Sequence, residues 1–418
     1  MQKLIPAACV PIFLKDIIKS LLSYFFLKRV NIINKFHKKI SNITGFKYVR
    51  TFQSGYLALY HLLVKINGDK KNGEIIIPVY TCPSVYYAVV NSDLRPVYID
   101  SDLENFNSSH ESLKNKISKN TMAIMVLHVF GCYSINISEL RNLLSELGRE
   151  DILIIEDMCQ ALGDVKNFRS SKKQYADYGI LSFGRAKMIS TVNGGALISN
   201  NPNILNAIPK KCLNSLYQNL YVFLKSIIFS LLIKPFFFNI AQSILARKRS
   251  ADPYNLKDYK NINHSNYSEL NTYQASLGSK MLNRIDEFNS RRKENAEFYL
   301  KYFDNNQKYL IQPIVNNFYL RFAVIFEDKH DCKFIKDFLY ENGINTSTVN
   351  YPLLSEINNF KASTFSAEFC NASKIATNIL TFPTHPDVKM LNHTNLFDEL
   401  FEILTKRDEE KYYMKVTK

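Results

Sequence analysis

Short runs of consecutive apolar residues alternate with segments of helical periodicity through the middle of the chain. Such runs, bounded by turn residues such as Asn72-Gly73, are typical of strands that are buried on both faces. The runs predicted as strands are 74–79, 96–99, 123–127, 152–155, 179–183 and 196–198. The segments predicted as helices between them are 84–91, 108–117 and 137–147. This alternation predicts an α/β fold with a mainly parallel sheet, which binds ligands at the carboxyl ends of its strands.

The two ends of the chain carry longer helical patterns. Residues 12–40 have apolar positions at helical spacing, and we expect a folded arm there because Pro6 and Pro11 break the run that a signal peptide needs. An apolar stripe that begins near Tyr273 predicts a long linking helix with Arg292 outside the stripe, followed by shorter strands and helices. We therefore predict an N-terminal helical arm (1–44), a large domain (45–272) and a smaller C-terminal α+β domain (273–418).

Residues 205–260 interrupt the alternation with an apolar insert. Most residues between 220 and 240 are aliphatic or aromatic, but Lys225 and Lys234 break the run short of the ~20 apolar residues of a membrane-spanning helix. A basic cluster follows at Arg247, Lys248 and Arg249. Three interpretations stay open: a buried hairpin or dimer contact, a helical segment lying on a membrane surface, and a transmembrane span.

Composition narrows the choice of partners. Of the 418 residues 46% are hydrophobic and 22% are charged, which is typical of a globular protein. The net charge of +15 reflects either a Lys-rich composition or attraction to an acidic partner, such as a nucleotide-linked substrate or a membrane. We expect no nucleic-acid partner, because no recognition motif accompanies the charge. The seven cysteines lack metal-ligand spacing, so we expect free thiols in a reducing cytoplasm and no metal site.

Two groups of polar residues fall where predicted strands end. The strand at 152–155 leads into Glu156 and Asp157, and a carboxylate at the carboxyl end of a strand faces the ligand crevice. Such an acid, taken alone, also serves as a helix cap or a magnesium ligand. Lys187 lies beyond the next strand, 30 residues after Asp157, and Gly194 and Gly195 permit a tight return of its loop. A lone lysine in a loop is usually solvated, but in this crevice a desolvated amine is a nucleophile.

A third group begins a predicted helix. Ser54 is a helix N-cap, and Gly55 lets a ligand approach the backbone amides at a helix start, where anions bind. Simple capping would explain this group on its own. Together, an amine, a carboxylate and an anion site at one sheet edge match pyridoxal 5'-phosphate (PLP). This cofactor takes a lysine Schiff base, an acid beside its pyridine nitrogen and donors for its phosphate.

Taken in chain order, several short segments resemble the DegT/DnrJ/EryC1/StrS family of PLP-dependent sugar aminotransferases. The likeness covers residues 45–405 apart from the insert, and it is specific as an ordered set. The segments are Ser54-Gly55, Ile77 to Thr81, Arg95 to Asp100, His128 to Gly131, Glu156 to Ala161, Ser182 to Gly195, Gln274 to Gly278, Arg284 to Arg292, Tyr351-Pro352 and Leu380 to Pro386.

The resemblance implies a role for each site residue. Lys187 would form the Schiff base and later move the proton between carbons, Asp157 would pair with the pyridine nitrogen, and Gln160 would lie near the ring hydroxyl. It also implies the PLP fold type I, a homodimer, a nucleotide-linked keto-sugar as substrate, glutamate as amino donor and a place in surface polysaccharide synthesis. The residues that would surround the phosphate are Ser54, Gly55, Tyr56 and Ser182.

Two positions depart from the family pattern. Tyr56 stands where Thr commonly follows the Ser-Gly pair, and Cys82 stands where an aromatic residue commonly stacks on the cofactor ring. These changes leave two alternatives open. One is a PLP-dependent sugar dehydratase, although the family's 3-dehydratases typically carry His in place of Lys187. The other is a non-catalytic, membrane-associated scaffold or regulator. We expect a cytoplasmic protein with peripheral contact to the inner face of the membrane through residues 216–249.

Overall fold

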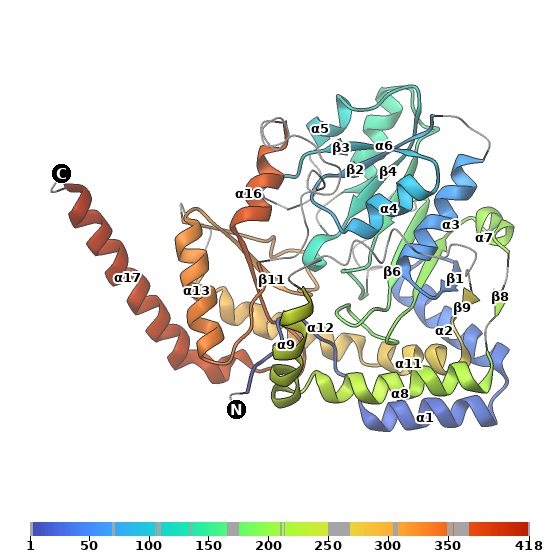
Figure 1. Ribbon diagram of the computed structural model, residues 1–418. Helices are drawn as coiled ribbons and strands as arrows, with labels where there is room; N and C mark the ends of the chain where they lie inside the picture. The colour runs from blue at the N-terminus through green and yellow to red at the C-terminus, as the bar shows by residue number, and fades with distance from the viewer. Residues whose placement is uncertain are drawn as a thin grey trace.

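Two sheets form the framework of the protein, seen here in a computed structural model (Figure 1). The larger sheet has seven strands and is mainly parallel, and the smaller has three strands and is antiparallel. The structure describes residues 3–68, 72–104, 106, 110–133, 136–164, 175–209, 211–212, 214–249, 268–303, 308–348, 354 and 368–416.

The large sheet confirms the predicted mainly parallel arrangement. Strands β2 to β6 run parallel, β7 pairs antiparallel with β6, and β1 pairs antiparallel with β7. Strand β1 was not among the predicted runs because its polar Arg50 and Thr51 interrupt the apolar pattern. The strands, in the spatial order β1-β7-β6-β5-β4-β2-β3, are Tyr48–Phe52, Gly195–Ser199, Tyr178–Ser182, Leu153–Asp157, Thr121–Leu127, Glu74–Pro78 and Arg95–Ile99.

Both faces of this sheet are buried. Ile75 and Ile77 of β2 pack in one apolar core with α3 and α4, whereas Ile76 between them packs in a second core with α6. Alternate side chains therefore find cover on opposite sides, which explains why the strands are continuously apolar. The helices that follow these strands are α3 (Gly55–Asn67), α4 (Pro83–Asn91), α5 (His110–Lys114), α6 (Ile137–Glu146) and α7 (Asn203–Ala207).

The arm is helical, as the spacing predicted. It forms two helices, α1 (Leu14–Phe26) and α2 (Arg29–Thr44), because the backbone is extended at Leu27 and Lys28. Two predictions for the linking segment need correction. The predicted long helix is two helices, α11 (Thr272–Leu282) and α12 (Ile285–Tyr299). Arg292 was placed outside the apolar stripe, and that prediction is wrong, since its side chain is fully buried. It is buried because its guanidinium finds backbone and amide acceptors inside the core.

The insert forms α8 (Leu216–Leu232) and α9 (Pro235–Arg249). Among the described residues, no single helix is long and apolar enough to cross a membrane. The pair Leu216–Leu232 and Pro235–Gln242, bent by 98°, meets the length and composition test only together. One face of α8 is buried at Val222 and Ser226, while its opposite face is exposed. Helix α8 is therefore not the buried hairpin of the first interpretation, and a dimer contact or a membrane contact stays open.

The C-terminal part has its own small sheet and core. Phe303, Phe322 and Phe382 stand at the centre of that core, and the three strands are antiparallel. The division of the chain at residues 44/45 and 272/273 remains a prediction. The strands are β10 (Tyr309–Ile311), β11 (Phe322–Phe326) and β12 (Ile379–Phe382). The helices are α13 (Lys329–Glu341), α16 (Cys370–Asn378), η4 (Met390–His393) and α17 (Thr394–Val416). A short parallel pair, β8 (Lys211–Cys212) and β9 (Ser268–Glu269), flanks the insert.

Candidate active site

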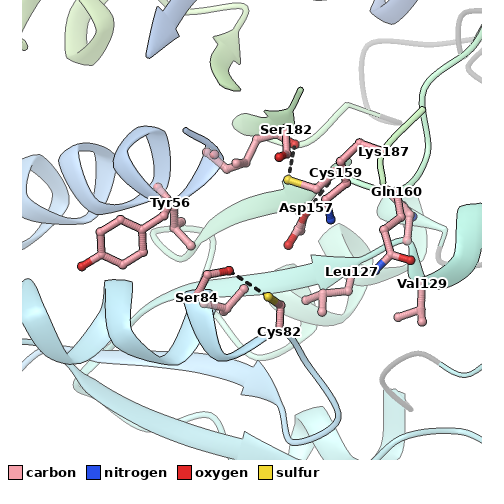
Figure 2. A pocket seen from close by; sticks show the side chains of 15 residues that line it. Tyr56, Cys82, Ser84, Leu127, Val129, Asp157, Cys159, Gln160, Ser182 and Lys187 are labelled. Carbon is pink, nitrogen blue, oxygen red and sulfur yellow. Dashed lines mark hydrogen bonds between the residues drawn. The ribbon is translucent and has the colours of Figure 1, made fainter. Parts of the chain in front are cut away.

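A cavity at the carboxyl ends of the central strands collects seven of the eight residues singled out from the sequence (Figure 2). Ser54 is the exception. It does not line the cavity, and its side chain instead accepts a hydrogen bond from the Leu57 amide at 3.1 Å, as an N-cap does. The seven that line the cavity are Gly55, Tyr56, Cys82, Asp157, Gln160, Ser182 and Lys187.

The sheet fixes the position of the Asp157 carboxylate. Asp157 is the last residue of β5 and is paired on one side with Leu127 of β4 and on the other with Ile180 of β6. Its Oδ1 atom accepts a hydrogen bond from the Cys159 amide at 2.9 Å. A carboxylate that is held by paired strands on both sides keeps its direction, and here it points into the cavity.

The loop that carries Lys187 returns tightly to the sheet. The Phe183 amide donates to the Gly194 carbonyl at 2.8 Å, and the Thr191 amide donates to the Phe183 carbonyl at 3.0 Å. A Cβ atom on Gly195 would lie 2.6 Å from the Gly55 Cα atom, so only glycine lets the start of α3 come this close. The glycine pair therefore holds the lysine loop and the helix start together, as the sequence predicted.

A buried arginine supports this loop from behind. The Arg292 guanidinium donates to the carbonyl of Met188, the residue after Lys187, at 3.3 Å and to Asn289 Oδ1 at 3.2 Å. Burial lowers the pKa of Arg292 to about 10, which still leaves it charged at neutral pH. Sequence reasoning missed this support because the partner carbonyl is 104 residues away in the chain.

Two thiols border the cavity from opposite sides. In Figure 2 the Cys82 and Cys159 sulfur atoms lie on either side of the Asp157 carboxylate. Burial raises the pKa of the Cys159 thiol well above its usual value, Asp157 raises it further, and Lys187 acts in the opposite direction. The thiol therefore stays protonated. Cys159, Asp157 and Lys187 all line the cavity. Ser84 donates to the Cys82 sulfur at 3.0 Å.

One cavity-lining residue that the predicted site did not include is His128, which forms a buried pair with Glu156 beside the cavity. His128 Nε2 lies 3.1 Å from Glu156 Oε1, both side chains are buried, and the imidazole stacks on Tyr133 with ring centroids 3.7 Å apart. Glu156 and Asp157 are adjacent, so the pleat sends their side chains to opposite faces of the sheet. His128 directly follows β4, and its place at the carboxyl end of a predicted strand was the signal available in the sequence.

Hydrogen bonds orient the side chains of the other two predicted residues, Tyr56 and Gln160. The Tyr56 hydroxyl accepts a hydrogen bond from Asn91 at 2.8 Å, and its ring points away from Lys187, so only its backbone faces the anion site at the start of α3. Gln160 accepts from the Phe130 amide at 2.9 Å, which orients its side-chain amide. The Tyr351-Pro352 motif of the family resemblance lies outside the described residues.

The donor set fits PLP. At Gly55 a Cβ atom would approach the Leu181 carbonyl to 3.1 Å and the Ser182 Cβ to 3.2 Å, so the glycine leaves a cradle of backbone beside a serine hydroxyl. A helix start with such a cradle suits a phosphate. An amine at Lys187 and a carboxylate at Asp157 complete the groups that the cofactor's aldehyde and pyridine nitrogen require.

The α/β fold and this cavity define a PLP-dependent enzyme class in which a loop lysine and a strand-end acid share one sheet edge. The chain belongs to the DegT/DnrJ/EryC1/StrS aminotransferase family, whose model matches residues 13–400. The predicted family, fold class and enzyme class are thereby confirmed. The match begins at residue 13, within the N-terminal arm, whereas the motif resemblance began at residue 45.

Named relatives include two GDP-perosamine synthases. The protein from Vibrio cholerae is 27% identical over 64% of this chain and 61% of its own length, and that from Escherichia coli O157:H7 is 23% identical over 77% of each. Among solved structures, Helicobacter pylori PseC, an aminotransferase of pseudoaminic acid biosynthesis, has a TM-score of 0.70 at 17% identity over 96% of this chain and 99% of its own. An E. coli GDP-4-keto-6-deoxy-D-mannose-3-dehydratase with hydrated PLP has a TM-score of 0.69 at 18% identity over 97% and 100%. The structural likenesses show the fold.

Proposed function

We propose that this protein is a PLP-dependent aminotransferase that converts a nucleotide-linked keto-sugar into an amino sugar for surface polysaccharide. The observation that carries the proposal is that Lys187 and Asp157 line one cavity at the carboxyl edge of the sheet. When bound, PLP supplies an electron sink that makes the carbon–hydrogen bond of an attached amine acidic. The remaining chemistry belongs to the side chains around it.

Each predicted residue has a task in this proposal. Lys187 would hold the cofactor covalently and would move the proton between carbons as a general base and acid. Asp157 would keep the pyridine nitrogen protonated, because a carboxylate stabilises an adjacent positive charge. Gln160 would serve the ring hydroxyl. The Ser182 hydroxyl and the amides of Gly55 and Tyr56 would hold the phosphate, at the helix start that Ser54 caps. Cys82 would contact the ring.

The relatives support the proposed substrate. Both named synthases have GDP-linked products by name, which supports a nucleotide-linked sugar as the substrate of this chain. We propose glutamate as the amino donor, a homodimer as the assembly and the cytoplasm as the compartment, with peripheral membrane contact through residues 216–249. The presence of Lys187 favours transamination over dehydration.

The central test is Lys187→Ala beside the exposed-lysine control Lys65→Ala. Wild type and the control should bind PLP with visible absorbance. Borohydride reduction should then attach the cofactor permanently to Lys187, as the mass of the modified peptide will show. Both proteins should also aminate one or more nucleotide keto-sugars with glutamate. Lys187→Ala should lose at least about a thousandfold in rate. An unchanged rate would refute the proposal, a deoxy-ketose product would indicate a dehydratase, and a colourless wild type would favour the scaffold alternative.

A further inference from the structure

Helices α1 and α8 present a continuous apolar surface to solvent. They run side by side along the lower edge of the molecule in Figure 1 and contact each other directly. The residues that define this α1/α8 face are each 47–57% exposed. They are Ile18, Leu22 and Phe25 from α1, with Tyr221, Leu224 and Ile228 from α8. Exposed aromatic and aliphatic side chains at helical spacing on two neighbouring helices mark an interaction surface.

Packing against α11 turns both apolar stripes to the same side. The Asp16 carboxylate of α1 pairs with Arg284 just after α11, and the Ser226 hydroxyl of α8 is hydrogen-bonded to Tyr273 of α11. Helix α11 contacts both helices, and the sides of α1 and α8 that face it are buried. The exposed stripes lie away from α11, so they form one surface.

The charge of the protein is concentrated in the segments that build this surface. Residues 1–49 contain nine Lys and Arg and one acid, a net charge of +8, and residues 203–250 contain seven Lys and Arg and no acid, a net charge of +7. These two segments therefore account for the whole formal charge of +15, and the rest of the chain is neutral. The single acid, Asp16, is buried and paired. Exposed Lys15 and Lys19 flank the α1 stripe, and Lys225 lies 4.2 Å above the Tyr221 ring.

We infer that the α1/α8 face docks on an anionic lipid bilayer, with both helices lying in the plane of the membrane surface. A second copy of this chain is the poorer occupant, because a two-fold dimer would set two positively charged surfaces without exposed acids against each other. Anionic headgroups supply the opposite charge, and the acyl region accepts the leucine and phenylalanine side chains. This inference deepens the peripheral membrane contact proposed above by naming its lipid and by adding α1 to it, and it does not depend on the proposed transamination.

Vesicle flotation of the full-length protein tests the inference. The protein should float with vesicles that contain phosphatidylglycerol, float less with pure phosphatidylcholine vesicles and be released by salt, because the attraction is partly electrostatic. The double variant Leu224→Glu/Ile228→Glu should lose roughly tenfold or more in partitioning, and Ile18→Glu/Leu22→Glu should lose a similar amount. The matched control, Val315→Glu/Leu391→Glu, replaces apolar residues that are 74% and 60% exposed elsewhere and should float like wild type.

The outcomes separate lipid from protein partners. Each variant is shown to be folded by the visible absorbance of bound cofactor. If no cofactor is bound, a melting temperature equal to that of the wild type shows the same. Wild-type protein that stays in the bottom fraction with both vesicle types, and so does not float, would overturn the inference. Equal flotation of the glutamate variants would also overturn it. A change of oligomeric state in the α8 variant without a change in lipid binding would overturn it in favour of a contact between copies.

Discussion

Asp157 and Lys187 border one cavity from two adjacent strands, although 30 residues separate them in the chain. Asp157 ends β5 opposite Ile180 of β6, and β6 ends two residues later at Ser182. The loop beyond Ser182 stays at this edge because Gly194 and Gly195 return the chain to β7. Parallel pairing of β5 with β6 thus brings the acid and the amine together, which no property of either residue alone would do.

Replacing Asp157 with Asn should separate cofactor binding from catalysis. The amide cannot balance a protonated pyridine nitrogen, so we expect the rate of amino transfer to fall by roughly a hundredfold or more. Absorbance titration should still show a bound cofactor, and stopped-flow measurement with glutamate reports the rate. Asp151→Asn is the control, since Asp151 precedes the same strand at its opposite end and its largely exposed carboxylate pairs with Arg149. A wild-type rate in Asp157→Asn would remove this residue from the site.

Ser182 and Tyr56 should differ as phosphate contacts. Ser182→Ala removes a hydroxyl that would donate to an anion, and we expect PLP affinity to fall roughly tenfold. Tyr56→Phe removes a hydroxyl bonded to Asn91, so PLP affinity should hold while stability falls by about 1 kcal/mol. Fluorescence titration with PLP and chemical denaturation give the two quantities. Loss of affinity in Tyr56→Phe would mean that its side chain contacts the cofactor after all.

Gly195 should tolerate no side chain. The Cβ atom of Gly195→Ala would lie 2.6 Å from the Gly55 Cα and the Leu181 oxygen, so the start of α3 must move. We expect a stability loss of roughly 1–3 kcal/mol together with weaker PLP binding. Gly184→Ala in the same loop is the stability control, because its Cβ would meet nothing closer than 3.6 Å. Equal denaturation midpoints for the two variants would contradict this explanation.

His385 should make stability depend on pH. Burial lowers the pKa of its imidazole from 6.5 to about 4, and Nε2 donates to the Pro6 carbonyl at 3.1 Å, which ties the N-terminal residues to the segment after β12. The unfolded chain then binds a proton that the folded chain does not. Stability is therefore full above pH 6.5 and is lost as the pH falls toward about 4, by about 3 kcal/mol.

Denaturation of His385→Gln across this pH range checks the assignment. The slope between pH 6.5 and 4 should become shallower, whereas replacing the exposed His330 with Gln should leave it as in wild type. An unaltered slope in His385→Gln would show that other groups cause the pH dependence.

The mainly parallel sheet and most of the site could be predicted from local patterns in the amino-acid sequence. Buried strands leave continuous apolar runs, glycine pairs mark tight returns, and a strand's carboxyl end predicts which polar residues face a ligand. These are local patterns set by the period of the backbone, so they can be recognised one segment at a time. Lys187, Asp157, Ser182 and the start of α3 were found in this way, and they line one cavity.

The contacts between distant side chains could be learned only from the folded chain. The Tyr56 hydroxyl is hydrogen-bonded to Asn91, and Arg292 is hydrogen-bonded to the loop that carries Lys187. His128 pairs with Glu156. No residue close in sequence to these side chains identifies their partners. The α1/α8 face likewise exists only because two segments some two hundred residues apart pack on α11. Contacts through space depend on the relative placement of whole elements, and the periodicity of a single segment carries no information about that placement.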